Sequence, residues 1–432
     1  MPSLLLRSLL LSSLAVRSQT FVLRASTSRA SSFSALKMLS SSSNKVQETL
    51  DPCVVLIKHM IAEYEHEWKD RGGIFSLAQG VVYWEPPDSV TTALQEGMRS
   101  NTLHMYGPDE GLPELRQAVE VKLKEENNLS DHHVMITAGA NQAYMNCILT
   151  LLGDGDQCVF FRPYYFNHIM ATQLAVGNAG VVLGECNDQG VPDLAWLEQE
   201  LSSNPSIKAV TLTNPGNPTG VSLDKQVLQR LVDLCQQHNK WLVLDCTYEH
   251  FQHNSDDDNT AFHCFEDPHV IHIFSFSKGF ALAGYRCGYV VVSKEADDLY
   301  QQMRKVQDTI PICPSRFSQH AALGALSAGR PWVTDKVKTL KIGREAILEA
   351  LSPLEQVMGG SGAMYVMGKL PKDRSDDQEV ARSFVKDHGV AVIPGTFCGF
   401  PGWIRVCYSN LPPEQCIKAA DRLANGIKKL CQ

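Results

Sequence analysis

Seven short apolar runs, separated by amphipathic helical patterns, constrain the fold of this 432-residue chain most strongly. The runs are rich in β-branched residues, mostly apolar on both faces and bounded by Gly, Pro, Asn or Asp, which is typical of strands buried in a mostly parallel sheet. They span 133–137, 157–162, 181–184, 209–214, 241–245, 270–276 and 288–292. Between them, segments such as 224–239 carry an apolar stripe at helical spacing. The alternation predicts an α/β sheet covered by helices.

The two ends of the chain have a different pattern from the middle. Residues 48–92 and 326–432 combine helical patterns with short strand-like runs such as AMYVMGKL and WIRVCYS. We therefore predict a large domain over residues 93–325 and a smaller α+β domain built from 48–92 and 326–432.

Residues 1–47 are rich in Ser, Leu and Arg, and the first acidic residue is Glu48. This composition is typical of an organelle targeting segment, for a mitochondrion or a plastid. The Leu-rich start also resembles the apolar part of a signal sequence, and a Ser-rich tail without a targeting role is an alternative. An internal start at Met38 would leave a cytosolic form.

Charge and cysteine content exclude several classes of protein. The formal net charge of −8 argues against a nucleic-acid-binding surface. No uninterrupted apolar run approaches about 18 residues, so we expect no membrane span in the body of the chain. Thirteen scattered cysteines without a C-x-x-C pair favour reduced thiols over a disulfide framework or a metal site.

The strongest chemical signal is SFSKGFALAGYRCGY at 275–289, just past the sixth apolar run. A lysine held at a strand end, as Lys278 is, can act as a nucleophile toward a carbonyl when burial makes it easier to deprotonate. Ser275, Ser277 and Arg286 offer the donors that a phosphate prefers. Taken alone, the motif is also consistent with a surface lysine in a Gly-rich turn.

Two further motifs also follow predicted strands. NPGNPTG at 214–220 is a rigid turn that would present the side-chain amide of Asn217. DCTY places Asp245 at the carboxyl end of a strand, where open α/β sheets bind ligands, with Tyr248 close behind. A carboxylate there can keep a ring nitrogen of a cofactor protonated. Each motif alone is also consistent with an ordinary turn.

TAGANQA at 137–143 lies between a predicted strand and a helix. Gly139, Ala140 and Asn141 would open that helix, so their backbone amides can bind an anion. The G-x-G-x-x-G spacing of a dinucleotide site is absent.

Taken in chain order, the four motifs resemble the class I/II aminotransferases, which are pyridoxal-phosphate (PLP) enzymes of fold type I. The resemblance covers nearly all of the chain after residue 48. It implies ping-pong amino transfer through a Schiff base on Lys278, with Lys278, Asp245 and Tyr248 as catalytic residues. It implies that the cofactor-binding residues are Tyr106, Gly139, Ala140, Asn141, Tyr165, Asn217, Asp245, Tyr248, Ser275, Ser277, Lys278 and Arg286.

The same resemblance assigns roles to single residues outside those motifs. Tyr165 in RPYYFNH matches the aromatic residue that stacks on the PLP ring. Tyr106 in YGPDEGLPELRQAV matches a tyrosine that reaches the phosphate of a neighbouring subunit, which implies a homodimer with shared active sites. Arg405 in GWIRVCYS matches the arginine that binds the substrate α-carboxylate, together with Gly80 and Asn217.

A closer resemblance is visible in SLAQGVVYWEPP, MYGPDEGLPELRQA, PYYFN, FSFSK and IPICPS. These segments are similar to the plant aromatic and methionine aminotransferases that act on indole-3-pyruvate, which implies those amino donors and 2-oxo acid acceptors. Tyr83 and Trp84 become candidate walls of the substrate pocket, although ordinary packing explains them equally well. The alternatives are a carbon–sulfur β-lyase or decarboxylase that uses the same lysine and, more remotely, a non-catalytic binding module.

Overall fold

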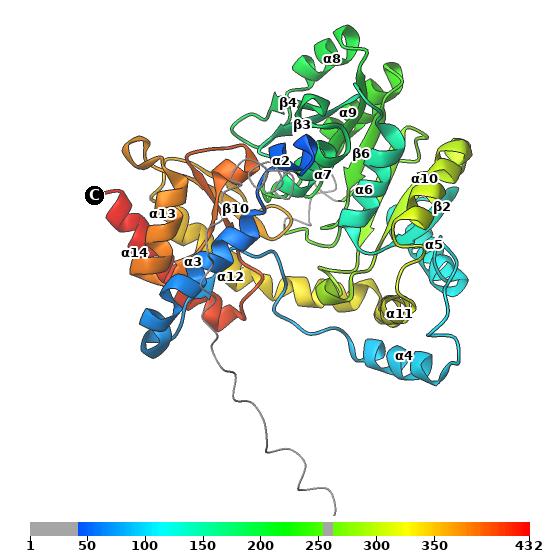
Figure 1. The fold of residues 1–432 in the computed structure, drawn as a ribbon. Helices are drawn as coiled ribbons and strands as arrows, with labels where there is room; N and C mark the ends of the chain where they lie inside the picture. Colours follow the sequence, from blue (N-terminus) through cyan, green and yellow to red (C-terminus); the bar gives the residue numbers. More distant parts are fainter. Residues whose placement is uncertain (1–41, 254–261) are drawn as a thin grey trace, which may run out of the picture. The chain divides into compact units, whose positions relative to one another are not determined.

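The computed structural model of the protein describes residues 42–253 and 262–432, and its larger sheet has seven strands. Their order is β2-β8-β7-β6-β5-β3-β4; β8 is antiparallel to both of its neighbours and the other pairings are parallel (Figure 1). The strands are β2 (His132–Thr137), β3 (Gln157–Arg162), β4 (Val181–Glu185), β5 (Ile207–Thr213), β6 (Trp241–Asp245), β7 (Val270–Ser275) and β8 (Gly288–Ser293). Every predicted run forms one of them, so the mostly parallel α/β sheet is confirmed.

Helices cover both faces of this sheet because successive side chains of a strand point to opposite sides. Phe160 of β3 belongs to the core beneath α6, α7 and α10, whereas its neighbours Val159 and Phe161 belong to the core beneath α5, α8, α9 and α11. The helices are α5 (Pro113–Asn127), α6 (Ala140–Leu151), α7 (Phe166–Val176), α8 (Leu194–Ser203), α9 (Lys225–Gln237), α10 (Asp297–Thr309) and α11 (Arg316–Lys338). The predicted helix over 224–239 is α9, which buries its apolar stripe.

A second, antiparallel sheet has the order β12-β13-β10-β9, and both ends of the chain contribute to the region around it. Its strands are β9 (Val357–Gly359), β10 (Tyr365–Lys369), β12 (Ile393–Pro394) and β13 (Trp403–Cys407). A separate parallel pair joins β1 (Phe75–Ser76) to β11 (Val390–Ala391). The domain boundaries at residues 47, 92 and 325 stay predictions.

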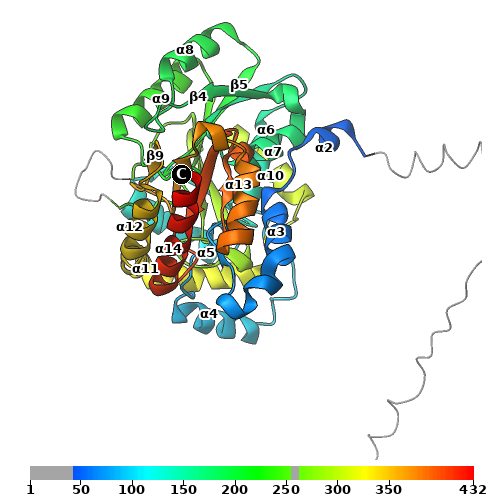
Figure 2. The same ribbon diagram turned by 90° about the vertical axis from the view of Figure 1, so that its left-hand side faces the viewer.

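Five further α-helices surround this second sheet or connect it to the first (Figure 2). They are α3 (Cys53–Trp68), α4 (Asp88–Arg99), α12 (Leu340–Leu351), α13 (Asp377–Ser383) and α14 (Pro413–Leu430). α12 packs along α14, and α4 packs against α11. Gly324 of α11 permits that contact, because a Cβ there would lie 2.5 Å from the backbone oxygen of Ser89.

The predicted targeting segment, with its internal start at Met38, lies mostly outside the described residues. Its last part forms helix α2 (Asn44–Glu48), which packs against α7. Lys45 donates a hydrogen bond of 2.8 Å to the carbonyl oxygen of Ala175. The backbone N–H of Leu50 donates one of 3.0 Å to the Gln173 side chain.

Two expectations from composition concern the body of the chain. None of the helices within residues 42–253 and 262–432 is long and apolar enough to cross a membrane. All thirteen cysteines fall within these ranges, where each is a free thiol and only Cys431 is exposed. Burial raises the pKa of several of these thiols, Cys158 to about 12, so they are inert structural groups.

Candidate active site

The predicted site residues converge on a cavity of about 490 Å³ at the carboxyl ends of β5, β6 and β7. Such a crevice is where an open α/β sheet binds its ligands. The predicted site residues that line this cavity are Gly80, Ala140, Asn141, Tyr165, Asn217, Asp245, Tyr248, Ser275, Ser277, Lys278, Arg286 and Arg405. Gly139 does not line the cavity itself but is the N-cap residue of α6, immediately before the lining residue Ala140. Tyr106 does not line it and is 78% exposed.

Lys278 follows β7 and reaches into the cavity, where its Nζ donates a hydrogen bond of 2.5 Å to the carbonyl oxygen of Gly80. Burial lowers the pKa of Lys278 to about 8, and the nearby cations Arg405 and Arg286 add to the effect. About a tenth of this amine is therefore unprotonated at pH 7, far more than of an ordinary lysine, and the unprotonated form is the one that acts as a nucleophile and base.

This lowered pKa gives a prediction for the cofactor-free protein. We expect Lys278 to react with a small acylating reagent increasingly as the pH rises through about 8. An unfolded lysine keeps its proton up to about pH 10.4, so between these values the folded state binds fewer protons and gains stability as the pH rises. Mass spectrometry after brief labelling measures the midpoint, with half-exposed Lys294 as the internal reference. A labelling midpoint near pH 10.4 at Lys278, the value of an unfolded lysine, would contradict the prediction.

Asp245 is the last residue of β6, only 4% exposed, and it points into the same cavity. Its carboxylate lies 3.2 Å from Nε2 of His168 and accepts a 3.0 Å hydrogen bond from the backbone N–H of Thr247. Burial raises the pKa of Asp245, but the interactions with His168 and Thr247 outweigh burial and hold it below its ordinary value. A buried anion is thus available for a cationic partner.

A chain of hydrogen bonds joins Arg405 and Asn217, the side chains predicted to bind the substrate, to two tyrosines. Arg405 of β13 donates from Nη1 to the Asn217 side-chain oxygen at 2.9 Å and from Nη2 to the carbonyl oxygen of Ala78 at 2.7 Å. Asn217 donates in turn to the Tyr248 hydroxyl at 3.4 Å, which lies 2.8 Å from the hydroxyl of Tyr365. Arg405 is 2% exposed, and its Nε is buried without a hydrogen-bond partner. The guanidinium group therefore keeps an unused donor beside the cavity.

At the end of the cavity beside α6, several hydrogen-bond donors and one guanidinium group are placed to bind an anion. Gly139 has a φ of +85°, and a Cβ there would lie 2.4 Å from an Nη atom of Arg286, so only glycine permits this close approach. Arg286 itself is left-handed, with a φ of 56°, and its guanidinium group lies 3.5 Å from the Ser277 hydroxyl. The first backbone N–H groups of α6, from Ala140 and Asn141, add two donors that a helix cannot satisfy internally.

These groups fit pyridoxal phosphate. The amine of Lys278 matches the aldehyde, Asp245 matches the ring nitrogen, and the Asn217 amide with the Tyr248 hydroxyl matches the ring oxygen. Ser275, Ser277, Arg286 and the start of α6 match the phosphate. Tyr165 is partly buried and offers an aromatic face, and desolvation raises its pKa to about 12, so its hydroxyl stays neutral.

Three residues near the reacting groups were missed by the sequence prediction: His168, Thr247 and Tyr365. His168 lies three positions after Tyr165 in RPYYFNH, so the first turn of α7 places its ring beside Tyr165 and Asp245, and this helical spacing was the available signal. Tyr365 stands in β10, where it packs under the guanidinium group of Arg405 at 4.5 Å. Only the long-range pairing of β10 with β13 brings it there.

The two candidate walls Tyr83 and Trp84 do not line the cavity. Trp84 is buried, stacks on Phe251 and donates a hydrogen bond of 3.2 Å to the carbonyl oxygen of Gly279. Tyr83 donates to the hydroxyl of Thr339 instead. Packing, the alternative explanation, therefore accounts for both, and the apolar part of the cavity is supplied by Pro52, Val54, Val81 and Phe166.

Comparison with known proteins supports the same family as the sequence motifs. The sequence model of the class I and II aminotransferase family matches residues 73–423. Aromatic aminotransferase ISS1 of Arabidopsis thaliana is 42% identical over 383 residues, which cover 88% of this chain and 94% of that protein. The aspartate/prephenate aminotransferase of Thermus thermophilus is 28% identical over 392 residues, which cover 89% of this chain and 98% of that protein.

Solved structures of other aminotransferases have a similar fold. Aspartate aminotransferase from Thermus thermophilus with maleate has a TM-score of 0.79 and 27% identity, covering 89% of this chain and 99% of its own. Aromatic aminotransferase from Pyrococcus horikoshii OT3 has a TM-score of 0.75 and 26% identity, covering 82% and 96%. The family match spans both sheets and every cavity-lining residue except Pro52 and Val54. The chain therefore belongs to the class I and II aminotransferase family.

Proposed function

We propose that this PLP-dependent aminotransferase moves the amino group of an aromatic amino acid or methionine to a 2-oxo acid by a ping-pong exchange at Lys278. One observation carries the proposal: the Lys278 amine, the Asp245 carboxylate and the Arg405 guanidinium group line the same cavity. These groups can move a proton, stabilise a cationic ring nitrogen and bind an α-carboxylate, which are the needs of amino transfer.

Each residue has a separate task in this mechanism. When bound, pyridoxal phosphate supplies an electron-accepting ring for the electron pair that deprotonation leaves on the substrate Cα. Asp245, anionic at neutral pH, stabilises positive charge on the ring nitrogen. Arg405 binds the α-carboxylate and so directs the Cα–H bond toward Lys278. The amine of Lys278 removes the Cα proton of the first substrate and delivers a proton to Cα of the second.

The Arg405→Lys variant tests the carboxylate site. We expect KM for the amino acid to rise about 10- to 100-fold with a smaller change in kcat, because an ammonium group cannot make the two-pronged contact. Steady-state kinetics with each substrate varied in turn measures both constants. Arg374→Lys, at an exposed position, is the matched control. An unchanged KM in Arg405→Lys would remove Arg405 from the substrate site.

The charges of the cavity support a donor with a neutral side chain. Among the described lining residues, Lys278, Arg286 and Arg405 are the cations, and each already has a task at the amine, the phosphate or the α-carboxylate. A second carboxylate, as in aspartate, would find no further cation among the described residues that line this cavity. Val54, Val81 and Phe166 instead offer apolar surface. The name of the Arabidopsis relative, an aromatic aminotransferase, agrees with this preference.

A donor panel crossed with 2-oxo acids, indole-3-pyruvate included, tests the substrate class. We expect kcat/KM for phenylalanine, tyrosine, tryptophan and methionine to exceed that for aspartate by about 10-fold or more. Turnover should stop when the 2-oxo acid is omitted. Ammonia or thiol release without an acceptor would indicate a lyase, and a preference for aspartate would contradict the neutral-donor assignment.

We propose a homodimer in which Tyr106 contributes to the partner's phosphate site, since its side chain is exposed and lies outside the cavity of its own chain. Mixing Tyr106→Ala subunits with Lys278→Ala subunits is the direct test. A mixed dimer would hold one site with both residues intact, so activity should exceed that of either variant alone. No gain on mixing would contradict shared sites.

For the N-terminal segment we propose an organelle targeting role, on the grounds of its Ser-, Leu- and Arg-rich, acid-free composition. Residues 1–47 fused to a fluorescent protein should direct it to a mitochondrion or a plastid. A fusion that begins at Met38 is the matched control and should stay in the cytosol. Cytosolic fluorescence from both fusions would contradict the proposal.

A further inference from the structure

A buried ion pair lies directly behind the turn that carries Tyr248. Glu249 contacts the ammonium group of Lys122 and accepts a hydrogen bond of 3.0 Å from the side-chain amide of Asn127. The Lys122 and Glu249 side chains are only 7% and 8% exposed. Lys122 also lies 4.6 Å from the ring centre of Phe274, in the strand that leads to Lys278. A pair of ions is thus held in the core between α5 and the active-site strands.

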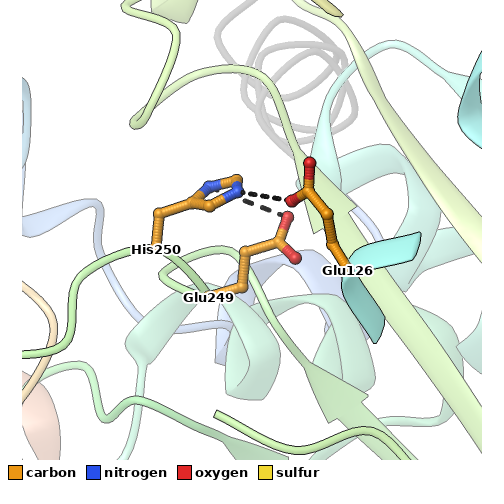
Figure 3. Close-up of side chains that lie close together, drawn as sticks. All are labelled: Glu126, Glu249 and His250. Carbon is orange, nitrogen blue, oxygen red and sulfur yellow. Dashed lines mark hydrogen bonds and ion pairs between the residues drawn. The ribbon is translucent and has the colours of Figure 1, made fainter. Parts of the chain in front are cut away.

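A second, more open layer surrounds this pair. His250 lies 3.2 Å from the carboxylate of Glu126, and its ring is 3.9 Å from Glu249 (Figure 3). The three potential ligand groups lie within 4.8 Å of one another. The ammonium group of Lys122 already neutralises Glu249, however, so the cluster is better explained as an ion-pair network than as a cation site.

Glu249 stays ionised in this position. Burial raises the pKa of Glu249, but Lys122, His250 and the hydrogen bond from Asn127 outweigh burial and hold it below the ordinary value. A buried charge is costly unless it is paired and hydrogen-bonded, and a hydrophobic pair of similar size would often be as stable. Stability alone therefore explains this network poorly, and a role in holding the adjacent turn in place explains it better.

One peptide bond joins Glu249 to Tyr248, so the ion-pair network is linked directly to the turn that carries Tyr248. Tyr248 lines the active-site cavity, whereas Glu249 lines a different cavity together with His250. The turn is closed by hydrogen bonds from the N–H of Glu249 to Cys246 and from the N–H of Phe251 to Tyr248. Anchoring the Glu249 side chain to α5 therefore limits how far the Tyr248 hydroxyl can move from Asn217 and Tyr365.

We propose that Glu249 is a positioning residue, whose ion pair with Lys122 holds Tyr248 at the ring oxygen of the cofactor. This inference rests on the proposed role of Tyr248 in cofactor binding. Glu249 touches neither the cavity nor the reacting groups, so it acts only through its neighbour.

A double-mutant cycle tests the proposal with the cofactor-loaded enzyme. Glu249→Gln should lower kcat/KM by about 10-fold, and the Tyr248→Phe/Glu249→Gln double variant should be no worse than Tyr248→Phe alone, because both changes remove the same effect. Glu126→Gln, in the outer layer of the same cluster, is the matched control and should keep wild-type kinetics. Effects of Glu249→Gln and Tyr248→Phe that multiply would overturn the proposal.

A spectroscopic titration supplies a readout that does not depend on turnover. The absorbance of the cofactor bound at Lys278 should change with pH at a midpoint that Glu249→Gln and Tyr248→Phe shift in the same direction. A midpoint unchanged in Glu249→Gln would overturn the positioning role even if the variant lost activity. If Glu249→Gln does not fold, Glu249→Asp keeps the charge and is put through the same cycle and titration. A wild-type enzyme without transaminase activity would instead contradict the proposed function, and the titration would still be interpretable.

Discussion

Replacing Lys278 with alanine should reduce transamination by at least about 10,000-fold, because the variant loses the group that moves the Cα proton and the attachment point of the cofactor. The cavity itself should persist, since Lys278 makes its side-chain hydrogen bond to the carbonyl oxygen of Gly80 and does not pack in the core. Turnover of phenylalanine with a 2-oxo acid measures the loss.

Borohydride reduction gives the Lys278→Ala experiment a second readout. Reduction should fix the cofactor covalently to the wild-type chain at residue 278 and leave the variant unlabelled, as peptide mass spectrometry would show. Lys294→Ala, half exposed at the start of a surface turn, is the control and should be labelled and active like the wild type. Substantial activity in Lys278→Ala, or labelling at another lysine, would remove Lys278 from its assigned role.

Asp245→Asn is expected to cause the second largest loss, about 100- to 1000-fold in kcat. The amide oxygen can still accept the hydrogen bond from the Thr247 N–H, and the amide nitrogen can donate to an unprotonated Nε2 of His168, so the geometry should survive while the negative charge is lost. Without that charge a cationic ring nitrogen is no longer stabilised at the end of β6. Single-turnover kinetics with phenylalanine separates this loss in the chemical step from a weaker affinity for the cofactor.

Asp267→Asn is the matched control for that change, since Asp267 is a largely buried carboxylate close to the opposite end of the same sheet, before β7. Its variant should retain wild-type kcat. A loss in Asp267→Asn as large as that in Asp245→Asn would indicate a general effect of removing a sheet carboxylate, and the charge argument would fail.

Much of the fold and of the site was predictable because the relevant signals are local. Strands such as β3 and β6 are short, apolar on both faces and bounded by turn residues, and their predicted and observed limits coincide. Asp245 is the last residue of one predicted strand, and Lys278 lies two positions after the end of another. Parallel strands end at one edge of a sheet, so these two side chains had to lie near each other.

The unpredicted part depends on contacts between residues far apart in sequence. Lys122 and Glu249 are 127 positions apart, and neither has a neighbour in sequence that reveals the pairing. Pro52 and Val54 line the cavity only because α3 packs beside β12 and the segment that follows it. Tyr83 and Trp84 were misleading for the same reason, because their sequence position near Gly80 does not determine which way a side chain turns.

The pairing of β1 with β11 also sets an order of assembly. Phe75 and Ser76 leave the ribosome about 315 residues before Val390 and Ala391. The seven-stranded sheet needs only residues 132–293, so it can form while the C-terminal strands are still being made. Residues 52–76 are therefore made before their partner strand β11 exists, and the cavity wall formed by Pro52 and Val54 can be completed only after β12 has been made.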